Sequence, residues 1–224
     1  DGPGPMHIID ASMRASGKSK TVDAASVIAT GRAAPRMIYA DSDEEMDKRI
    51  TSLALAGDAT VLIDNVVGEI GCQSLDAAIT STTYRGRVLG KSKMTPPMPM
   101  RIVWWATGNG MVVGADLARR AILGRLEPNC AHPEERDGPA PNTTWKYPRL
   151  LQHVHQQRAE LLSDALTVMR AHVVAGRPRP SKMRPMDFEA WTDTVRSAIV
   201  WLDYDDPGTT IRDVRAADIR ADAL

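Results

Sequence analysis

Short apolar runs alternate with longer segments of helical periodicity over residues 1–130 of the chain. Five of these runs have the length and composition of β-strands: residues 6–9, 36–40, 60–64, 102–106 and 122–126. The third and the fourth are apolar at nearly every position, which is typical of strands that are covered on both faces. Strands that alternate with helices predict an α/β fold, in which a parallel five-stranded sheet is flanked by helices.

The connecting helices are predicted over about residues 18–30, 43–56 and 72–82. The second begins with a capping box, in which the side chains of Ser42 and Glu45 satisfy the first backbone N–H groups. These helices and the five strands form the predicted core domain, residues 1–145.

A second domain is predicted after a linker. Residues 128–148 are rich in Pro, Gly and Asn, which favour irregular structure. Beyond them, apolar positions recur at helical spacing over residues 151–173 and 187–202. We therefore predict a small helical lid domain, residues 146–224.

Composition narrows the class of protein without assigning a function. Hydrophobic residues make up 43% and charged residues 25%, which is ordinary for a soluble globular protein. No apolar run reaches the roughly 18 residues of a membrane-spanning helix, so we expect a cytoplasmic protein without a membrane partner. The 28 basic and 28 acidic side chains cancel, so that any nucleic-acid site must be local. Residue 1 is Asp rather than Met, and we expect a piece of a longer protein.

A phosphate-binding motif directly follows the first predicted strand. Residues 12–19 have the sequence Ser-Met-Arg-Ala-Ser-Gly-Lys-Ser, which matches the P-loop pattern G-x-x-x-x-G-K-[ST] except at Ser12. In a P-loop, backbone N–H groups and the start of the next helix surround phosphate oxygens, and here they belong to Arg14, Ala15, Ser16 and Gly17. In this interpretation Lys18 would reach the β- and γ-phosphates, and the Ser19 hydroxyl would bind Mg²⁺. The alternative is a polar turn between strand and helix.

An acidic residue ends the third predicted strand. Asp64 follows the apolar residues 61–63, and open α/β sheets bind their ligands at the carboxyl ends of the strands. Its carboxylate can hold Mg²⁺ together with Ser19. The alternative for Asp64 taken alone is that it caps a helix or a turn. Together with the loop at residues 12–19, it predicts a site for ATP and Mg²⁺.

A third element completes a familiar order, because the strand at residues 103–106 ends in Thr107-Gly108-Asn109. The order of the motifs over residues 6–127 resembles the AAA+ and superfamily 3 ATPases, in which this strand carries the sensor 1 residue. The pattern is similar to helicase-like ATPases of bacteriophages, prophages and mobile elements, which often follow a primase-polymerase module in one chain. The resemblance implies a ring, typically a hexamer, that hydrolyses ATP to move along DNA in the cytoplasm of a bacterial host.

The resemblance also assigns roles to residues outside the first two motifs. Asn109 would hydrogen-bond the γ-phosphate or the attacking water. Arg119 or Arg120 would reach the nucleotide of a neighbouring subunit as an arginine finger, since the planar donors of a guanidinium match phosphoryl oxygens. Either arginine could instead pair with Asp116 in the same helix. Arg196, in the second predicted lid helix, would contact phosphates as a sensor 2 residue.

Asn65 departs from the family pattern, because it stands where these ATPases usually carry the glutamate that activates water. An amide is no general base at neutral pH. Glu69, Glu44 or Glu45 could supply the carboxylate, or Asn65 could orient the water while another group accepts its proton. Glu44 and Glu45 also have a simpler explanation, because capping and the helix dipole favour acids in the first turn of a helix.

Positive charge is concentrated just before the sensor strand. Residues 77–115 contain no Asp or Glu, and their basic residues are Arg85, Arg87, Lys91, Lys93 and Arg101. In the family that the chain resembles, a hairpin at this place lines the central pore and grips DNA. The resemblance implies that the phosphates of single- or double-stranded DNA are contacted by Arg85, Arg87, Lys91 and Lys93. The alternatives are a solvated basic loop and arginines that close the nucleotide site of a neighbour.

Three functions are compatible with these features. The first is a Mg-ATP-dependent motor, a replicative DNA helicase. The second is a nucleotide-binding assembly module that does not hydrolyse ATP, in which Asn65 marks lost catalysis. The third is a loader or initiator ATPase that remodels a protein partner.

Overall fold

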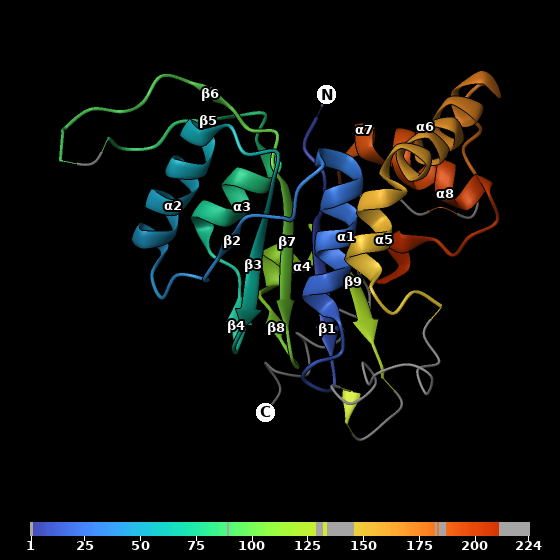
Figure 1. Cartoon of the computed structure of the whole chain (residues 1–224). Helices are drawn as coiled ribbons and strands as arrows, with labels where there is room; N and C mark the ends of the chain where they lie inside the picture. The colour runs from blue at the N-terminus through green and yellow to red at the C-terminus, as the bar shows by residue number, and fades with distance from the viewer. Residues whose placement is uncertain are drawn as a thin grey trace.

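The computed structural model describes residues 2–88, 90–128, 132–133, 146–181, 183 and 187–210. Its centre is a parallel five-stranded sheet in the order β2-β3-β7-β1-β9 (Figure 1). In chain order, the strands are β1 (Met6–Ala11), β2 (Arg36–Met37), β3 (Thr60–Val66), β7 (Val103–Gly108) and β9 (Ala121–Leu126). The predicted α/β fold is confirmed. Strand β2 is shorter than predicted, because the chain leaves the sheet after Met37 and exposes 76% of Ile38.

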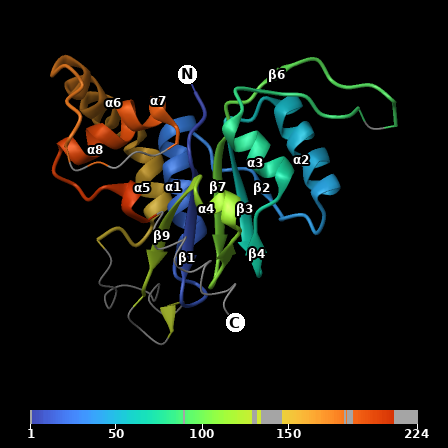
Figure 2. The same cartoon turned by 180° about the vertical axis from the view of Figure 1, so that it is seen from behind.

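Helices cover both faces of the sheet, as Figures 1 and 2 show from opposite sides. Successive strand residues point to opposite faces, so Leu62 packs in one apolar cluster with Val22, whereas Ile63 belongs to a second cluster with Ile50. The helix on the first face is α1 (Lys18–Thr30). The helices on the second face are α2 (Asp43–Ala56), α3 (Gln73–Thr80) and α4 (Ala115–Ala118). The two clusters bind the three layers into one core.

Two small sheets extend this core. β4 (Glu69–Ile70) and β8 (Val112–Val113) pair in parallel beyond the ends of β3 and β7. β5 (Thr83–Tyr84) and β6 (Met98–Pro99) pair antiparallel and form the base of a long hairpin, residues 83–99. Farther along the hairpin, Arg87 pairs with Met94.

The hairpin is fixed to α2 at its base. A Cβ atom on Gly86 would lie 1.7 Å from Thr51 Oγ1, so only glycine allows this close approach. Figure 1 shows the hairpin projecting past α2 at the upper left. It therefore leaves the sheet at the amino ends of the strands, opposite the edge to which the strand arrows point.

The C-terminal helices lie beside α1 and β9 (Figure 1). The Arg158 guanidinium donates to the Val27 carbonyl at 2.9 Å, and the Thr210 hydroxyl accepts from the Leu123 N–H at 3.1 Å. The helical segments are α5 (Leu150–Gln156), α6 (Arg158–Val174), α7 (Glu189–Trp191), the π-helix η2 (Thr192–Arg196), α8 (Ser197–Trp201) and the 3₁₀-helix η3 (Pro207–Thr209).

These helices differ in detail from the two that were predicted. The predicted helix over residues 151–173 is interrupted at Gln157, and the one over residues 187–202 contains the π-helix. The predicted boundary at residue 145 and residues 211–224 of the predicted lid lie outside the described residues. Over the described part of the chain, no helix combines the length and the apolar character that crossing a membrane requires.

Candidate nucleotide site

The carboxyl ends of β1, β3 and β7 meet at one edge of the sheet, the lower edge in Figure 1. β7 lies between β1 and β3. The chain runs from β1 outward to β2 and later returns to β9 on the other side of β1. Such a reversal of strand order opens a crevice that binds ligands in α/β proteins.

The loop between β1 and α1 has the backbone of an anion site. Ala15 and Gly17 both adopt left-handed conformations, with φ of 55° and 96°, and α1 begins directly afterwards at Lys18. Residues that alternate between right- and left-handed conformations turn successive N–H groups into one concavity. Gly17 adopts this conformation at little cost, whereas Ala15 is held there at a cost of about 1 kcal/mol. The loop therefore offers N–H groups and a helix N-terminus to phosphate oxygens.

Ser12, which replaces the first glycine of the motif, has a contact of its own. Its hydroxyl donates to Glu127 Oε2 at 2.5 Å, and the Arg125 guanidinium donates to the other oxygen at 2.7 Å. These hydrogen bonds hold the pKa of the Glu127 carboxyl below its usual range. Ser12 thus ties the start of the loop to the end of β9.

Lys18 reaches across the crevice. Its Nζ atom lies 2.7 Å from Asn109 Oδ1 and 3.4 Å from the Met13 carbonyl oxygen. Burial lowers the pKa of the Lys18 ammonium, while the negative charges of Asp10 and Asp64 oppose that shift. The ammonium therefore stands between the loop that carries Asn109 and the loop that connects β1 to α1.

Asp64 is held by three donors from three different elements. Its Oδ1 accepts from the Ser19 hydroxyl at 2.9 Å and from the Thr107 hydroxyl at 2.6 Å, and its Oδ2 accepts from Arg36 Nε at 3.1 Å. Burial raises the pKa of Asp64, but these hydrogen bonds and the charge of Arg36 outweigh it, so that the net pKa is lowered. Asp64 is therefore ionised at neutral pH.

The Ser19 hydroxyl and the Asp64 carboxylate form a donor set that fits Mg²⁺, because both are hard oxygen ligands and lie within one coordination sphere of each other. Among the described residues, there is no group of three or more His, Cys, Asp or Glu that could hold a metal by itself. The remaining ligands would then be water and phosphate oxygens, which is how Mg²⁺ is usually held beside a nucleotide.

Three residues of this network were not predicted: Asp10, Arg36 and Thr107. Asp10 is 5% exposed, and its Oδ1 accepts from the N–H of Gly110 at 2.8 Å and of Met111 at 3.4 Å, which fixes the loop that carries Asn109. Asp10 and Thr107 each lie near the end of an apolar strand, a signal that could have found them. Arg36 carries no such signal.

Asn65 has a backbone role that explains its residue type. It lies in a bulge of β3 with φ of 56°, a left-handed conformation that asparagine tolerates better than most residues. Its N–H donates to the Thr107 hydroxyl at 3.2 Å, and its side chain is exposed. Left-handed geometry alone therefore favours asparagine here.

The carboxylates considered as general bases differ in their surroundings. Glu44 and Glu45 form exposed ion pairs within α2, at 3.1 Å from Lys48 and 3.3 Å from Arg49, which is the simpler explanation for them. Glu69 is exposed on β4, and a Cβ on Gly114 would lie 2.9 Å from its Oε1. None of the three has a hydrogen bond to Lys18, Asp64 or Asn109.

The two candidate finger arginines lie at the other edge of the sheet, because the N–H of Met6, the first residue of β1, donates to the Arg120 carbonyl. Arg119 is half-exposed and lies 2.5 Å from Asp116 in the same helical turn. Arg120 is largely buried and pairs at 2.8 Å with Asp76, whose pKa is raised by burial. The two arginines are therefore not equivalent, and only Arg119 extends into solvent.

The structure does not bring Arg196 to the nucleotide site, which corrects the sensor 2 expectation. Arg196 is 1% exposed, and its guanidinium donates to both carboxylate oxygens of Asp206 at 2.7 Å. A Cβ on Gly208 would lie 2.5 Å from Arg196 Cζ, so the guanidinium packs directly on this glycine. Its hydrogen bonds join the end of η2 to the turn that begins at Asp206.

The basic residues of the hairpin are all exposed: Arg85, Arg87, Lys91 and Lys93. Arg85 Nε donates to the Thr95 carbonyl across the hairpin at 3.2 Å. The hairpin lies at the amino ends of the strands, so these side chains are remote from Lys18 and Asp64 of the same chain. The alternative that these arginines close the nucleotide site of a neighbouring subunit stays a prediction.

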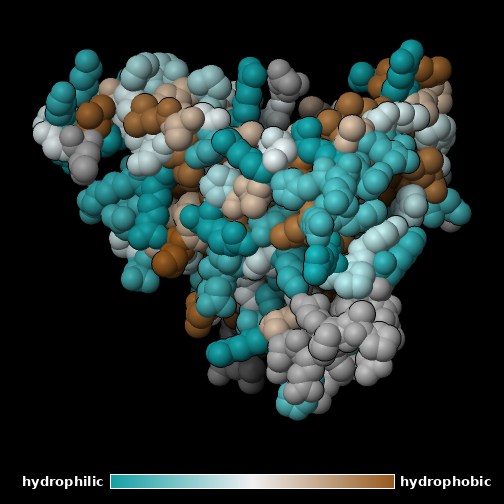
Figure 3. All heavy atoms as spheres, viewed as in Figure 1, coloured by the Kyte–Doolittle hydropathy of each residue, from teal (hydrophilic) through white to brown (hydrophobic). Residues whose placement is uncertain are grey.

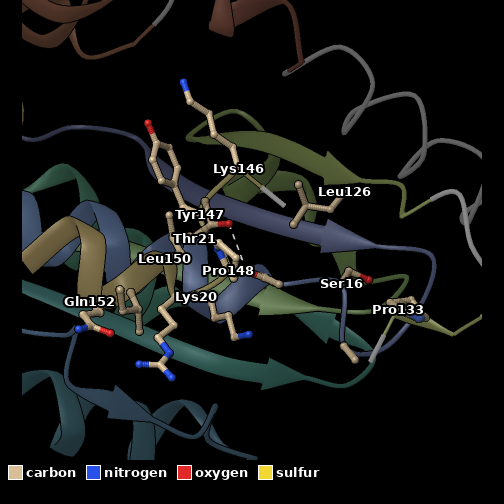
Figure 4. Close-up of a pocket in the computed structure, with 14 residues that line it drawn as sticks. Ser16, Lys20, Thr21, Leu126, Pro133, Lys146, Tyr147, Pro148, Leu150 and Gln152 are labelled. Carbon is tan, nitrogen blue, oxygen red and sulfur yellow. Dashed lines mark hydrogen bonds between the residues drawn. The ribbon is translucent and has the colours of Figure 1, made fainter. Parts of the chain in front are cut away.

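A cavity of about 600 Å³ opens beside the phosphate-binding loop (Figure 4). Ser16 and Leu126 line one side in that view, and Tyr147, Pro148 and Leu150 line the other. The Tyr147 ring stacks on His153 with centroids 3.9 Å apart, which makes a flat aromatic surface at the rim. The cavity therefore joins the loop to the segment that leads into α5.

Comparisons with known proteins give a remote likeness only. No protein-family model matches the chain, and no curated protein matches it. Two solved structures of a JCV helicase are similar in fold, with TM-scores of 0.45 for the helicase by itself and 0.43 for its complex with an acetamide compound. Each is 13% identical over 79% of this chain, which spans 57% of the helicase chain. A likeness of this kind assigns no activity.

Proposed function

We propose that the chain is an ATPase domain that binds ATP and Mg²⁺ and uses hydrolysis to move along DNA as a ring of subunits, in the manner of a replicative helicase. One observation carries the proposal: Lys18 meets Asn109, and Ser19 meets Asp64, at the same edge of the sheet. Packing requires no such meeting of a lysine, an amide, a hydroxyl and a carboxylate. A nucleoside triphosphate with its metal ion requires all four.

Each of these side chains has a role in the proposal. The loop N–H groups and Lys18 bind the phosphates, and Asn109 turns from Lys18 to the γ-phosphate or the attacking water. Ser19 and Asp64 would hold Mg²⁺, which neutralises phosphate charge when it is bound. Asp10 keeps the Asn109 loop in place through its two backbone hydrogen bonds.

We assign the base and the ribose to the cavity beside the loop. It borders Ser16 and Gly17 on the side where the phosphates end, and Leu126, Leu150 and Tyr147 give it apolar and aromatic walls. A nucleobase is flat and largely apolar on its faces, so it gains from such walls. In this assignment residues 146–224 act as the lid of a core that comprises residues 1–145.

DNA and the neighbouring subunit belong to the opposite edge of the sheet in this proposal. The exposed basic side chains of the hairpin contact DNA phosphates without reading sequence. Arg119 acts on the nucleotide of the next subunit, because its own phosphate-binding loop lies at the far edge. A primase-polymerase module in the same longer chain, a hexameric ring and the cytoplasm of a bacterial host complete the proposal.

A second candidate function rests on Asn65. Its exposed amide cannot act as a base, and no carboxylate among the described residues hydrogen-bonds to Asn65 or Asn109 in its place. In this alternative, bound ATP holds subunits together without being hydrolysed. The two functions differ in turnover and agree on nucleotide binding.

Binding of a fluorescent ATP analogue in the presence of Mg²⁺ tests the part that the two functions share. We expect Lys18→Ala to weaken binding by about 30-fold or more, because a partly buried positive charge that would pair with the phosphates is lost. Lys48→Ala removes an equally charged lysine from an exposed ion pair on α2 and should leave binding unchanged. Equal affinity in wild type and Lys18→Ala would contradict the proposal.

A further inference from the structure

Arg36 bridges two carboxylates at the nucleotide edge of the sheet. Its NH2 group lies 2.7 Å from Asp23 Oδ2 on α1, and its Nε lies 3.1 Å from Asp64 Oδ2 on β3. In the sheet, Arg36 pairs with Leu62 of the neighbouring strand, so its side chain extends along β3 toward Asp64. One guanidinium thus stands against the acid that the proposed function assigns to Mg²⁺.

The two carboxylates hold this guanidinium with unequal strength. Asp23 is buried, with 7% of its side chain exposed, and its contact with Arg36 is the shorter of the two. Asp64 has two further donors, Ser19 and Thr107. The Arg36 side chain is 46% exposed, so the guanidinium has room to move away from Asp64 while it remains on Asp23.

The single positive charge of Arg36 does not neutralise both of the carboxylates that it contacts. Asp23 and Asp64 bring two negative charges to one guanidinium, and the Oδ1 atom of Asp23 is buried without a hydrogen-bond partner. Arg36 Nε contacts Asp64 Oδ2, whereas the Ser19 hydroxyl contacts Oδ1. A divalent cation held by Ser19 and Oδ1 would share one carboxylate with the guanidinium, and the two positive charges would repel each other. The contact between Arg36 and Asp64 therefore raises the free energy of binding a divalent cation at Asp64.

We propose that Arg36 is a built-in competitor for the divalent cation at Asp64, and that Asp23 is the carboxylate that keeps the guanidinium when the cation binds. The inference rests on the proposed function, because it takes Asp64 as a ligand of the cation. It deepens that function by adding regulation. Nucleotide must bring its metal ion in against Arg36, so metal alone binds poorly and the site fills when both arrive together.

Binding of Mn²⁺ without nucleotide, followed by the electron paramagnetic resonance of the free ion, tests this competition. We expect Arg36→Gln to bind Mn²⁺ about threefold or more tightly than wild type, since a cation beside the carboxylate is removed. Arg36→Lys, which keeps the charge, should stay close to wild type. Arg49→Gln is the matched control, because it removes an arginine from an ion pair on α2.

A further variant shows where the gained ion binds. Adding Asp64→Asn to Arg36→Gln should abolish the gain, because the ligand itself is neutralised. Unchanged or weaker Mn²⁺ binding in folded Arg36→Gln would overturn the inference, as would a gain that survives Asp64→Asn. Circular dichroism of each variant separates these outcomes from a failure to fold.

The same variants keep the inference distinct from the proposed function. If Arg36→Gln gains Mn²⁺ affinity through Asp64 but neither it nor the wild type binds the ATP analogue, the nucleotide assignment fails while the competition stands. If the ATP analogue binds normally and Arg36→Gln leaves Mn²⁺ affinity unchanged, the competition fails while the nucleotide assignment stands.

Discussion

The polar and charged side chains at the two ends of the central sheet differ in their surroundings. At the carboxyl ends of the strands, Lys18 Nζ lies 2.7 Å from Asn109 Oδ1, and the Ser19 hydroxyl lies 2.9 Å from Asp64 Oδ1. Lys18, Ser19 and Asp64 are partly buried, whereas Asn109 is exposed. At the amino ends, the basic side chains of the hairpin extend into solvent. Figure 3 shows the face of the molecule that is seen in Figure 1. This face is largely hydrophilic, with apolar patches at the upper right over α6.

This difference separates a small, ordered site from an extended surface. Side chains that satisfy one another before the ligand arrives can select a compact ligand with fixed charges, because few rearrangements are needed. Exposed lysines and arginines suit a long polyanion, whose phosphates they meet one at a time. The comparison therefore predicts separable defects at the two ends.

The largest expected effect concerns the two arginines at the amino ends of the strands, Arg119 and Arg120. If Arg119 acts in trans, Arg119→Ala lowers ATP turnover by about 100-fold or more and leaves the melting temperature unchanged. Arg120→Ala should instead lower stability by about 1–3 kcal/mol, because Asp76 loses its ion-pair partner while it stays largely buried. Turnover and thermal unfolding of both variants check this contrast.

Mixing subunits sharpens the same test. Lys18→Ala subunits keep Arg119, so adding them to Arg119→Ala subunits should restore part of the hydrolysis in a shared ring. No restoration at any ratio, in a sample verified to be assembled, would count against action in trans.

The next largest effect concerns the affinity for DNA and should leave nucleotide binding unchanged. Replacing both Lys91 and Lys93 by alanine should weaken binding of single-stranded DNA by about tenfold and reduce its salt dependence, since two phosphate contacts are lost. Affinity for the ATP analogue should not change. Lys146→Ala removes a lysine at the cavity rim and serves as the control that spares DNA binding. Unaltered DNA binding in the double variant would exclude the hairpin as the contact.

The smallest effect concerns His7, the second residue of β1. His7 stacks on Trp105 with centroids 4.6 Å apart, and burial lowers its pKa from 6.5 to about 4. Between these values the unfolded chain binds a proton that the folded chain refuses, so stability falls as pH drops from 6.5 to 4. His7→Phe should remove about 1–3 kcal/mol of this loss.

Urea unfolding of His7→Phe and wild type across this range measures the effect. His155→Gln, at an exposed position of α5, should keep the wild-type pH dependence. Because the pKa of Asp64 is lowered, its protonation destabilises the fold only below the pH at which a normal carboxyl group titrates. His7 and Asp64 therefore lower the stability of the fold in different pH ranges. Equal pH profiles for His7→Phe and wild type would show that His7 carries no such penalty.

The parts of the molecule that were predictable are those that neighbours along the chain encode. The five strands, the first three helices and the loop at residues 12–19 follow from local periodicity and from one compact motif. The pairing of Ser19 with Asp64 also followed, because both stand at carboxyl ends in a parallel sheet. These features depend on spacing and on one topological rule.

The rest depends on which distant residues the fold brings together. Arg36 contacts Asp64 only because β2 pairs with β3, and Asp10 is bound by N–H groups that come 100 residues later. The left-handed backbone at Asn65 and the burial of Arg196 against Asp206 likewise follow from tertiary packing. Periodicity carries no information on such contacts.

The most direct test of the central claim is the rate of ATP hydrolysis with and without single-stranded DNA, in wild type and in Lys18→Ala, on samples verified to be assembled. We predict turnover in the wild type that DNA stimulates and that Lys18→Ala abolishes. Nucleotide binding without any turnover, with or without DNA, would contradict it and would favour an assembly module that ATP holds together.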